Sequence, residues 1–368
     1  MRFTTLGQLA IKHSRNAVAE RLYRTTGLDV TRPVAIYGLV NQHCNAKCRS
    51  CKFWRMDEYA EEMSIEQWQS AVLSLKEFIG KFSINFSGGE PFLKKDFLAL
   101  LEFCAEHGIL AGVTTNGSCF TPEVARRLVA ARPFNVNVSV DAPEPELHDH
   151  LRGMEGSFAR ICAGIERLAA EQTAQKISFP IIVKPTISAK NFHLLPEIVT
   201  WAGRIGATSV HFQPLERWSQ ETYDELWIGP LLAADFERII ERLLALKREG
   251  APILNNEQSL RMLGAHFREE KAPREMLPCV VGLRNYFIAP DGDVKVCGFF
   301  APLGNVRTQS AREIWHGRQA REIRRQTLEC QSLCLATCTS QKTLRDKFRM
   351  AWQLLRGQRH RGNGVPAP

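Results

Sequence analysis

The stretch from Asn41 to Trp54 reads NQHCNAKCRSCKFW and places Cys44, Cys48 and Cys51 within eight residues. The chain begins MRFTTLGQLAIKHSRNAVAERLYR, whose scattered charges interrupt the apolar core that a secretion signal requires. We therefore expect a cytoplasmic protein, in which thiols stay reduced. A cysteine cluster in such a protein is a metal or catalytic site rather than a set of disulfides.

The composition and charge limit the class of protein. The 368 residues are 44% apolar and 24% charged, which is ordinary for a globular chain of two or three packed units. The net charge of +9 lies at the two ends, because 35 basic residues face 36 acidic ones between residues 33 and 340. A polyanion-binding groove needs positive charge in the middle of the chain, so nucleic acid is not expected as a partner.

From residue 33 onward, β-branched runs alternate with amphipathic segments. The strand-like runs are 33–40, 82–89, 109–117, 134–142, 177–188 and 209–215. Helical patterns occupy 64–78, 94–107, 121–131, 157–171, 191–205 and 232–248. Six βα units predict parallel strands, and a complete TIM barrel needs eight. The predicted fold class is therefore α/β, with a partial (β/α)6 TIM-like barrel followed by a small cysteine-rich domain.

The predicted domain organisation has four parts. They are a basic helical extension at 1–32, the barrel at 33–249, the cysteine-rich domain at 250–340, and a basic amphipathic helix with its tail at 341–368. Within the third part, YFIAPDGDVKVCGF (286–299) predicts a hairpin around its Pro-Asp-Gly turn.

Polar motifs follow four successive strands of the predicted barrel. The cysteine loop follows the first strand, SGGEP (87–91) the second, TTNG (114–117) the third and SVDA (139–142) the fourth. Barrels of this kind carry function in the loops at the carboxyl ends of their strands, so we expect these motifs to converge on one rim.

Three clustered thiols indicate a particular metal centre. A structural zinc site needs four protein ligands, and no fourth cysteine or histidine follows at finger-like spacing. A [4Fe–4S] cluster held by three cysteines leaves one iron open, and S-adenosylmethionine offers an amine and a carboxylate for it. Gly88 and Gly89 would let backbone come close, and Glu90 could accept a hydrogen bond from an ammonium. Ser139 and Asp141 could meet ribose hydroxyls.

These motifs together resemble the radical S-adenosylmethionine (radical SAM) superfamily. The stretch DAPEPELHDHLRGMEGSF (141–158) and the later cysteines are similar to its branch with SPASM or twitch domains. The resemblance implies reductive cleavage of S-adenosylmethionine to a 5′-deoxyadenosyl radical, which abstracts hydrogen from a substrate C–H bond. It also implies a set of site residues: cluster ligands Cys44, Cys48 and Cys51, methionine contacts Gly88, Gly89 and Glu90, and ribose contacts Ser139, Asp141, Thr115 and Asn116. Ser50 departs from the family, which usually has a large residue there against the adenine; Phe53 or Trp54 could take its place.

A second group of cysteines predicts a second metal centre. Cys279 and Cys297 flank the hairpin, and CQSLCLATC supplies Cys330, Cys334 and Cys338. Five cysteines cannot fill the ligand positions of two clusters, so a single auxiliary [4Fe–4S] cluster is the interpretation, with one of the last three cysteines spare. Zinc is the alternative, because four thiolates also suit zinc.

The resemblance also implies an electron donor such as flavodoxin or ferredoxin. The substrate class stays open between a peptide or protein and a sugar, lipid-linked or other small molecule, with oxidation, epimerisation or cross-linking as the outcome. About 33 residues before the barrel are too few for the leader-binding domain of many peptide maturases. A rival interpretation is a non-catalytic iron–sulfur or zinc protein.

The remaining motifs have ordinary alternatives. In TLRDKFRMAWQLLRG (343–357), apolar residues fall on one helical face, and such basic helices at both termini could bind a membrane surface weakly or pack on the body. His148 and His150 are expected to be surface or cap residues. Arg152 suits either a cofactor carboxylate or a helix end. Three further cysteines are expected to be ordinary residues, namely Cys104, Cys119 and Cys162.

Overall fold

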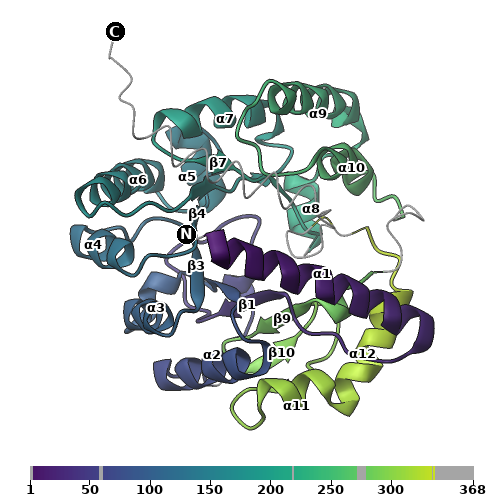
Figure 1. The fold of residues 1–368 in the computed structure, drawn as a ribbon. Coiled ribbons are helices and arrows are strands. Elements are labelled where there is room, and N and C mark those ends of the chain that lie inside the picture. The colour runs from purple at the N-terminus through teal and green to yellow at the C-terminus, as the bar shows by residue number, and fades with distance from the viewer. Residues whose placement is uncertain (1–2, 58–60, 218, 272–278, 334, 336–368) are drawn as a thin grey trace. The chain divides into compact units, whose positions relative to one another are not determined.

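The computed structural model describes residues 3–57, 61–217, 219–271, 279–333 and 335 (Figure 1). These residues form two compact units. One is built from the described parts of 3–115 and 269–335, and the other from the described parts of 116–268.

The first unit contains a mixed sheet whose centre is parallel. In sheet order its strands are β11 (Gly304–Asn305), β10 (Asp293–Lys295), β9 (Asn285–Ile288), β1 (Ala35–Leu39), β2 (Ser83–Ser87) and β3 (Leu110–Thr115). β1 is parallel to both of its neighbours, β2 and β9, and β2 is parallel to β3. β10 pairs antiparallel with β9, which confirms the predicted hairpin; its turn contains Gly292 with φ of +90°.

Helices connect and cover these strands. Those of the first unit are α1 (Phe3–Thr26), η1 (Phe53–Arg55), α2 (Ile65–Ile79), η2 (Pro91–Leu93), α3 (Phe97–Glu106), η6 (Val281–Leu283), α11 (Ala311–His316) and α12 (Arg318–Glu329). The start of α2 follows from a capping box: the Gln67 amide donates to the Ser64 hydroxyl at 3.3 Å, and the Ser64 amide donates to the Gln67 side chain at 2.8 Å.

Aromatic side chains fill the core between β2 and its helices. Trp68 and Phe86 are fully buried and meet edge to face, with ring centroids 5.8 Å apart, and Phe97 meets Phe86 in the same way at 5.9 Å. Gly38 of β1 makes room for them, because a Cβ there would lie 2.9 Å from both Phe86 and Trp68. This packing fixes the position of β1 against β2 and α2, and therefore the position at which the cysteine loop begins.

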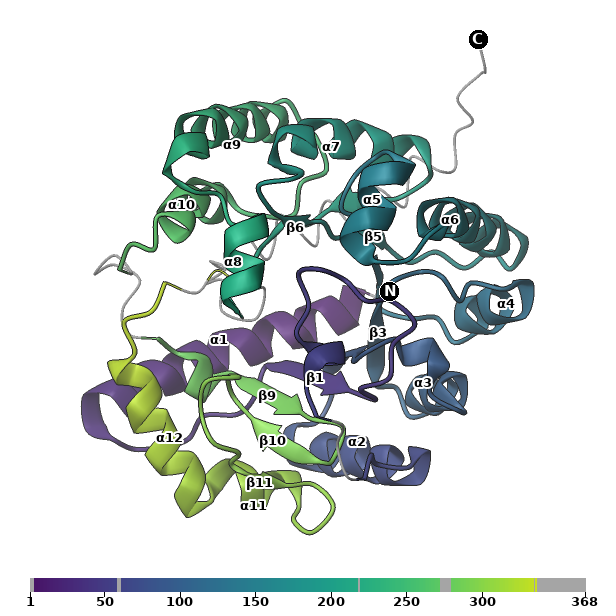
Figure 2. The ribbon, with the colours of Figure 1, turned by 180° about the vertical axis from the view of Figure 1, so that it is seen from behind.

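The N-terminal helix α1 packs against residues from the other end of the chain. The buried Asn16 side chain donates to the Leu283 carbonyl at 3.1 Å, and its oxygen accepts from the Arg32 amide at 2.9 Å. Glu20 forms an ion pair with Arg284 at 2.5 Å. Figure 2 shows α1 beside α12. Of the two alternatives for the N-terminal helix, the structure therefore shows the packed one.

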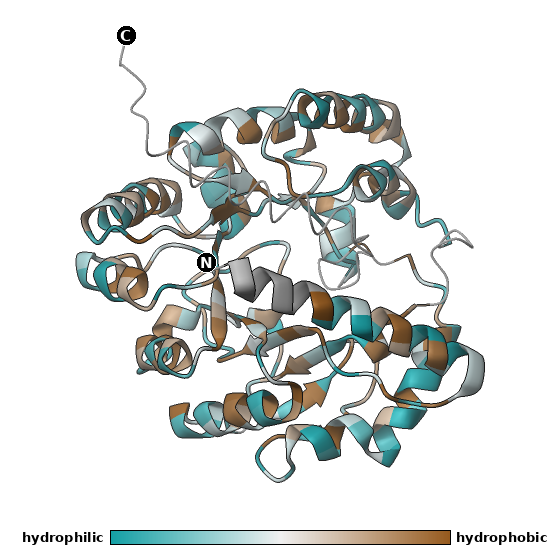
Figure 3. Ribbon diagram, in the orientation of Figure 1, coloured by the Kyte–Doolittle hydropathy of each residue, from teal (hydrophilic) through white to brown (hydrophobic). Residues whose placement is uncertain are grey.

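The second unit has short strands and longer helices. Its strands are β4 (Val136–Val138), β5 (Ile181–Val183) and β7 (Ser209–Val210), which are parallel, and a separate parallel pair, β6 (Thr186–Ile187) with β8 (Gln213–Pro214). Its helices are α4 (Pro122–Ala130), α5 (Pro145–Arg152), α6 (Ser157–Ala174), η3 (Phe192–Leu194), α7 (Leu195–Arg204), α8 (Gln220–Leu226), η4 (Pro230–Leu232), α9 (Ala233–Arg248) and α10 (Glu257–Phe267). Brown and teal residues share the helix surfaces in Figure 3, as expected of amphipathic helices.

The predicted alternation of strands and helices is confirmed, but two predicted strands are each divided. The run 177–188 forms β5 and β6, and 209–215 forms β7 and β8. The division of 177–188 falls at Lys184 and Pro185, where proline has no N–H for the ladder. The predicted C-terminal helix at 343–357 lies outside the described residues.

No helix in the described part of the chain combines the length and the apolar character needed to cross a lipid bilayer.

Candidate functional site

Three thiols lie together on the loop after β1. Cys48 is buried, and Cys44 and Cys51 are half-buried. The pKa of Cys44 is raised to about 11, chiefly by burial, with the Cys48 thiol, the Glu90 carboxylate and the Cys51 thiol adding to the effect. Each of these groups is therefore close enough to act on the others. A metal centre reverses the effect, because a coordinating thiol is deprotonated.

Hydrogen bonds hold the loop around the thiols. The Ala46 amide donates to Cys44 Sγ at 3.4 Å, and the Phe53 amide donates to Cys51 Sγ at 3.3 Å. The Trp54 indole donates to the Cys48 carbonyl at 3.0 Å. Amide donors to sulfur are among the features that tune iron–sulfur clusters, so this donor set fits such a centre.

The Gly-Gly-Glu turn after β2 interlocks with this loop. The Gly89 amide donates to the Asn41 carbonyl at 2.9 Å, and the Glu90 amide donates to the His43 carbonyl at 2.8 Å. A Cβ on Gly89 would lie 2.1 Å from the His43 oxygen, and one on Gly88 would lie 2.5 Å from the Asn41 oxygen. The glycines thus allow close approach to the cysteine loop itself; their contact with the cofactor stays a prediction.

Asn41 is a site residue that sequence reasoning missed. Its buried side chain donates to the Glu90 carbonyl at 2.9 Å and to the His43 carbonyl at 3.3 Å. It therefore ties the two loops together at the carboxyl ends of β1 and β2. The only sequence signal was its place at the start of the quoted motif, where a polar residue follows the buried Val40.

Glu90 and Thr115 come together from the ends of β2 and β3. Glu90 is fully buried, and one oxygen of its carboxylate accepts from the Thr115 hydroxyl at 2.7 Å and from the Phe92 amide at 3.3 Å. The structure thus joins two of the predicted cofactor residues to the cysteine loop within the first unit. Their contact with S-adenosylmethionine stays a prediction.

The other three predicted cofactor residues belong to the second unit. Asn116 accepts a hydrogen bond from the Ser118 amide at 2.9 Å, and Ser139 is half-buried just after β4. Asp141 is buried and paired with Arg152, whose Nε lies 2.8 Å from one carboxylate oxygen and whose Nη2 donates to the other at 2.9 Å. The Thr186 amide also donates to Asp141, at 2.8 Å. The geometry shows a structural role for Asp141, and the ribose contact stays a prediction.

His148 is fully buried in the same network, so the prediction of a surface or cap residue is wrong. Its Nδ1 accepts from the Asp141 amide at 3.2 Å, which leaves the proton of the neutral ring on Nε2. Burial, followed by the charge of Arg152, lowers the pKa of His148 to about 3. His150, by contrast, is partly exposed and lies 3.7 Å from Glu225.

A second set of thiols gathers in the first unit. Cys279 lies just before η6, Cys297 just after β10, and Cys330 caps the C-terminal end of α12. The pKa of Cys279 is raised chiefly by burial, and the Cys330 and Cys297 thiols add to the effect. These three cysteines are far apart in sequence but close in space. Cys334 and Cys338 lie outside the described residues.

Across the described residues, no three histidine, cysteine or acidic side chains lie close enough together to hold one metal ion. A [4Fe–4S] cluster binds its thiolates through separate irons, so its ligands are spaced more widely than those of one zinc ion.

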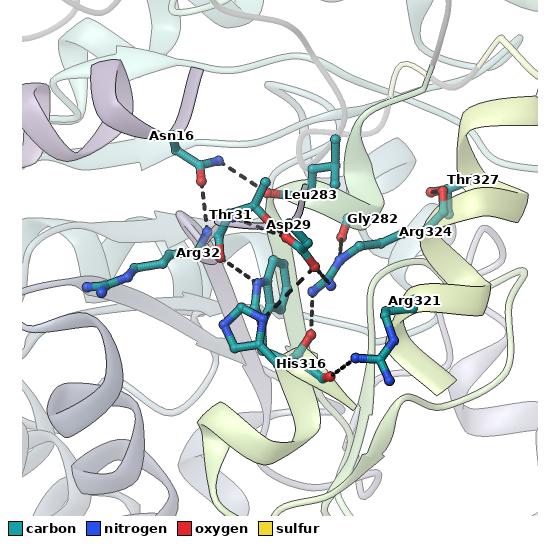
Figure 4. Close-up of polar contacts among 11 residues, drawn as sticks. Asn16, Asp29, Thr31, Arg32, Gly282, Leu283, His316, Arg321, Arg324 and Thr327 are labelled. Atoms are coloured by element: carbon teal, nitrogen blue, oxygen red, sulfur yellow. Dashed lines mark hydrogen bonds and ion pairs between the residues drawn. The ribbon is translucent and has the colours of Figure 1, made fainter. Parts of the chain in front are cut away.

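The buried Arg324 fastens α12 to η6 and to the segment after α1 (Figure 4). Its guanidinium donates to the Gly282 carbonyl at 3.0 Å, to the Trp315 carbonyl at 2.6 Å and to the Asp29 carboxylate. The helix that ends at Cys330 is thereby fastened to the turn that follows Cys279.

Comparison with known proteins agrees with this geometry. The model of the radical SAM superfamily matches residues 39–192, and that of the SPASM iron–sulfur cluster-binding domain matches residues 279–339, a range that contains all five later cysteines. The chain is 28% identical over 311 residues to the AdoMet-dependent heme synthase of Methanosarcina barkeri, covering 79% of this chain and 84% of that protein. It is 30% identical over 308 residues to the mycofactocin maturase MftC of Mycobacterium ulcerans, covering 80% of this chain and 78% of that protein.

A solved structure shares the fold. Streptococcus suis SuiB bound to its precursor peptide SuiA superposes with a TM-score of 0.64 at 16% identity, covering 84% of this chain and 71% of SuiB. The chain belongs to the radical SAM superfamily and carries a SPASM domain.

Membership confirms the predicted family, fold class and cofactors. The chain is an enzyme of this superfamily, its cofactors are a [4Fe–4S] cluster and S-adenosylmethionine, and its SPASM domain indicates auxiliary iron–sulfur binding. The interpretation as a non-catalytic iron–sulfur or zinc protein is set aside. The residue assignments and the domain boundaries stay predictions.

Proposed function

We propose that this enzyme removes a hydrogen atom from a C–H bond of its substrate after reductive cleavage of S-adenosylmethionine. The observation that supports this most is the interlock between the cysteine loop and the Gly88–Glu90 turn, because it places three thiols beside a buried carboxylate. When bound, the cluster and S-adenosylmethionine supply the 5′-deoxyadenosyl radical. An electron carrier such as flavodoxin or ferredoxin provides the electron.

The chain's own residues bind and orient these groups. Cys44, Cys48 and Cys51 would hold the first cluster and leave one iron open for the amine and carboxylate of the cofactor. Thr115 and the Phe92 amide already hold one oxygen of the Glu90 carboxylate, so that carboxylate is fixed before an ammonium arrives. Such preorganisation limits the entropy lost when the cofactor binds.

For the substrate, we propose a peptide or protein. Two related proteins support this class: MftC is named a maturase, and SuiB was solved with a precursor peptide. The described residues ahead of β1 form a helix packed on residues 283 and 284.

A second candidate is a small molecule of the tetrapyrrole class. Its support is that several relatives, among them the protein from Methanosarcina barkeri, are named heme synthases. This candidate belongs to the predicted small-molecule alternative, which also included sugars and lipid-linked compounds.

Anaerobic reconstitution tests the proposed chemistry. The full chain, loaded with iron and sulfide and reduced with dithionite, is expected to convert S-adenosylmethionine to 5′-deoxyadenosine. Replacing Cys44, Cys48 and Cys51 with alanine should abolish this product and remove about four iron atoms per chain. The matched control replaces the half-buried Cys119 and Cys162, which we expect to leave both values unchanged. Undiminished 5′-deoxyadenosine in the triple variant contradicts the proposal.

Deuterium transfer separates the two substrate classes. Deuterated peptides from the surrounding genes and deuterated iron porphyrins are each incubated with the enzyme under turnover conditions. Deuterium in 5′-deoxyadenosine from the peptide supports maturation, whereas deuterium from the porphyrin alone supports the second candidate and overturns the first.

A further inference from the structure

The C-terminal end of α1 and the helix α12 border an open groove on the first unit. Its volume is about 1000 Å³. Four arginines and one glutamate line it: Arg24, Arg318, Arg321, Arg325 and Glu322. The groove is thus strongly basic, although residues 33–340 as a whole are nearly neutral.

Most of this positive charge is available to a partner. Glu322 is already engaged by Arg325, at 2.6 Å, and by Gln326, at 3.0 Å. Arg321 donates to the uncharged His316 carbonyl at 3.0 Å. Arg24 and Arg318 have no ion-pair partner among the residues that the structure describes, and both are exposed. Unpaired guanidinium groups around an open groove attract and orient an anionic surface.

Three of the four arginines, Arg318, Arg321 and Arg325, lie on the firmly held helix α12. Arg324, on the inner side of α12, is 1% exposed and binds the Asp29 carboxylate (Figure 4). Its guanidinium also lies 4.3 Å from the ring of Trp315. Asp29 is flanked by two apolar residues, Leu28 and Val30, which are 57% and 51% exposed. Leu28 directly follows Gly27, which lines the groove. An exposed apolar side chain next to a basic groove is typical of a protein-binding surface.

The same helix leads to the second set of thiols. Cys330 directly follows the last residue of α12, and Leu328, two residues earlier, lines the groove. Arg325 and Cys330 are five residues apart, which corresponds to about 8 Å along a helix. Cys330 lies inside the matched iron–sulfur domain, so a protein bound in the groove would sit close to the auxiliary site.

We propose that this groove is the docking surface for an acidic one-electron carrier protein of the flavodoxin or ferredoxin class. The inference rests on the proposed function, which requires such a carrier. The reduced flavin or iron–sulfur centre of the carrier gives up one electron and is oxidised, the enzyme gains that electron, and no covalent bond forms or breaks. Charge complementarity gives fast association, and redox encounters bury little area, which suits an open groove.

Charge reversal tests the docking surface. Oxidised flavodoxin is titrated with the full-length, cluster-loaded enzyme, and binding is followed by flavin fluorescence in about 50 mM and 300 mM salt. R318E/R321E/R325E should weaken binding at low salt by about tenfold or more, and R318Q/R321Q/R325Q by less. Wild-type binding should weaken as salt rises. The matched control R204E/R242E/R248E reverses three exposed arginines of the second unit and should bind normally.

Two ways of reducing the enzyme distinguish failure of the docking surface from failure of the proposed function. With dithionite, the reversed variant should form 5′-deoxyadenosine as fast as the wild type, whereas with reduced flavodoxin it should be slower by a similar factor to the loss of binding. Equal flavodoxin binding by the reversed and wild-type enzymes overturns the docking surface. The same conclusion follows if the reversed variant binds heparin or a nucleic acid more weakly than the wild type does but binds flavodoxin equally well. Absence of 5′-deoxyadenosine from every variant with dithionite overturns the proposed function instead.

Discussion

The two cysteine regions of the first unit are built in different ways. Cys44, Cys48 and Cys51 belong to one short loop, which is held by hydrogen bonds from its own backbone and from the turn after the next strand. Cys279, Cys297 and Cys330 come from three separate elements and meet only because a helix, a hairpin and the N-terminal segment pack together. The first region depends on local backbone fit, and the second on a long-range polar network.

The largest expected effect is local to the first region. In Gly89→Ala, the new Cβ would meet the His43 oxygen at 2.1 Å, and neither backbone segment can move without breaking the interlock. We expect the free energy of unfolding to fall by about 4 kcal/mol. The first cluster should be lost while the second is retained, measured by iron content and electron paramagnetic resonance.

The control is Gly203→Ala. Gly203 lies within α7 with open space around the position of a Cβ, so alanine should leave both clusters intact and stability unchanged or slightly higher. Loss of both clusters together in Gly89→Ala would show that the regions are not independent.

A somewhat smaller loss of stability is expected from a substitution that affects the second cysteine region alone. Arg324→Met removes the buried guanidinium and leaves the Asp29 carboxylate without its cation. We expect the free energy of unfolding to fall by about 3 kcal/mol. The auxiliary iron should be released while the first cluster still supports reductive cleavage of S-adenosylmethionine, and chemical denaturation with iron analysis measures both.

Arg325→Met is the neighbouring comparison. Arg325 is exposed, and within the described part of the chain its ion pair is the surface one with Glu322, so the expected change in stability is within about 0.5 kcal/mol. If the two variants lost equal stability, the long-range network would not be what holds the second region.

The smallest effect concerns the buried network of His148, Asp141 and Arg152. This network contains no cysteine and serves as a reference for both cysteine regions. His148 is neutral in the folded protein because its pKa is lowered to about 3. In the unfolded chain it has an ordinary pKa near 6.5, so below that pH the unfolded state binds a proton that the folded state does not. Stability should therefore fall by about 1 kcal/mol between pH 7 and pH 5.5.

This fall should be absent in His148→Gln and present in His150→Gln, because His150 is partly exposed. Urea unfolding at several pH values measures it, and the NMR signal of His148 should not titrate above pH 5. A titration midpoint near 6.5 would contradict the assignment of a neutral, buried ring.

The sequence predicted well what depends on nearby residues. The cysteine spacing and the Pro-Asp-Gly hairpin are both patterns a few residues long, and each has a local physical cause. The alternation of strands and helices followed for the same reason.

Other features could not be predicted, because they depend on which distant residues meet. Nothing in the spacing of Asn16, Asp29 and Arg324 indicates that they join α1 and α12 around the second set of thiols. The glycines of the Gly-Gly-Glu turn illustrate the limit. Their convergence with the cysteine loop on one rim was predictable, but their direct approach to the backbone of that loop was not.

The position of β1 between β2 and β9 has a consequence for biosynthesis. Residue 39 ends β1 and residue 285 begins β9, so a ribosome adding 5–20 residues per second needs roughly 10 to 50 s to supply the second neighbour. Until then β1 has one unpaired edge, and α1 lacks the Leu283 carbonyl and the Arg284 guanidinium that later hold it. During that interval the nascent chain exposes an unpaired strand edge and an undocked helix, and exposed edges of this kind favour aggregation during folding.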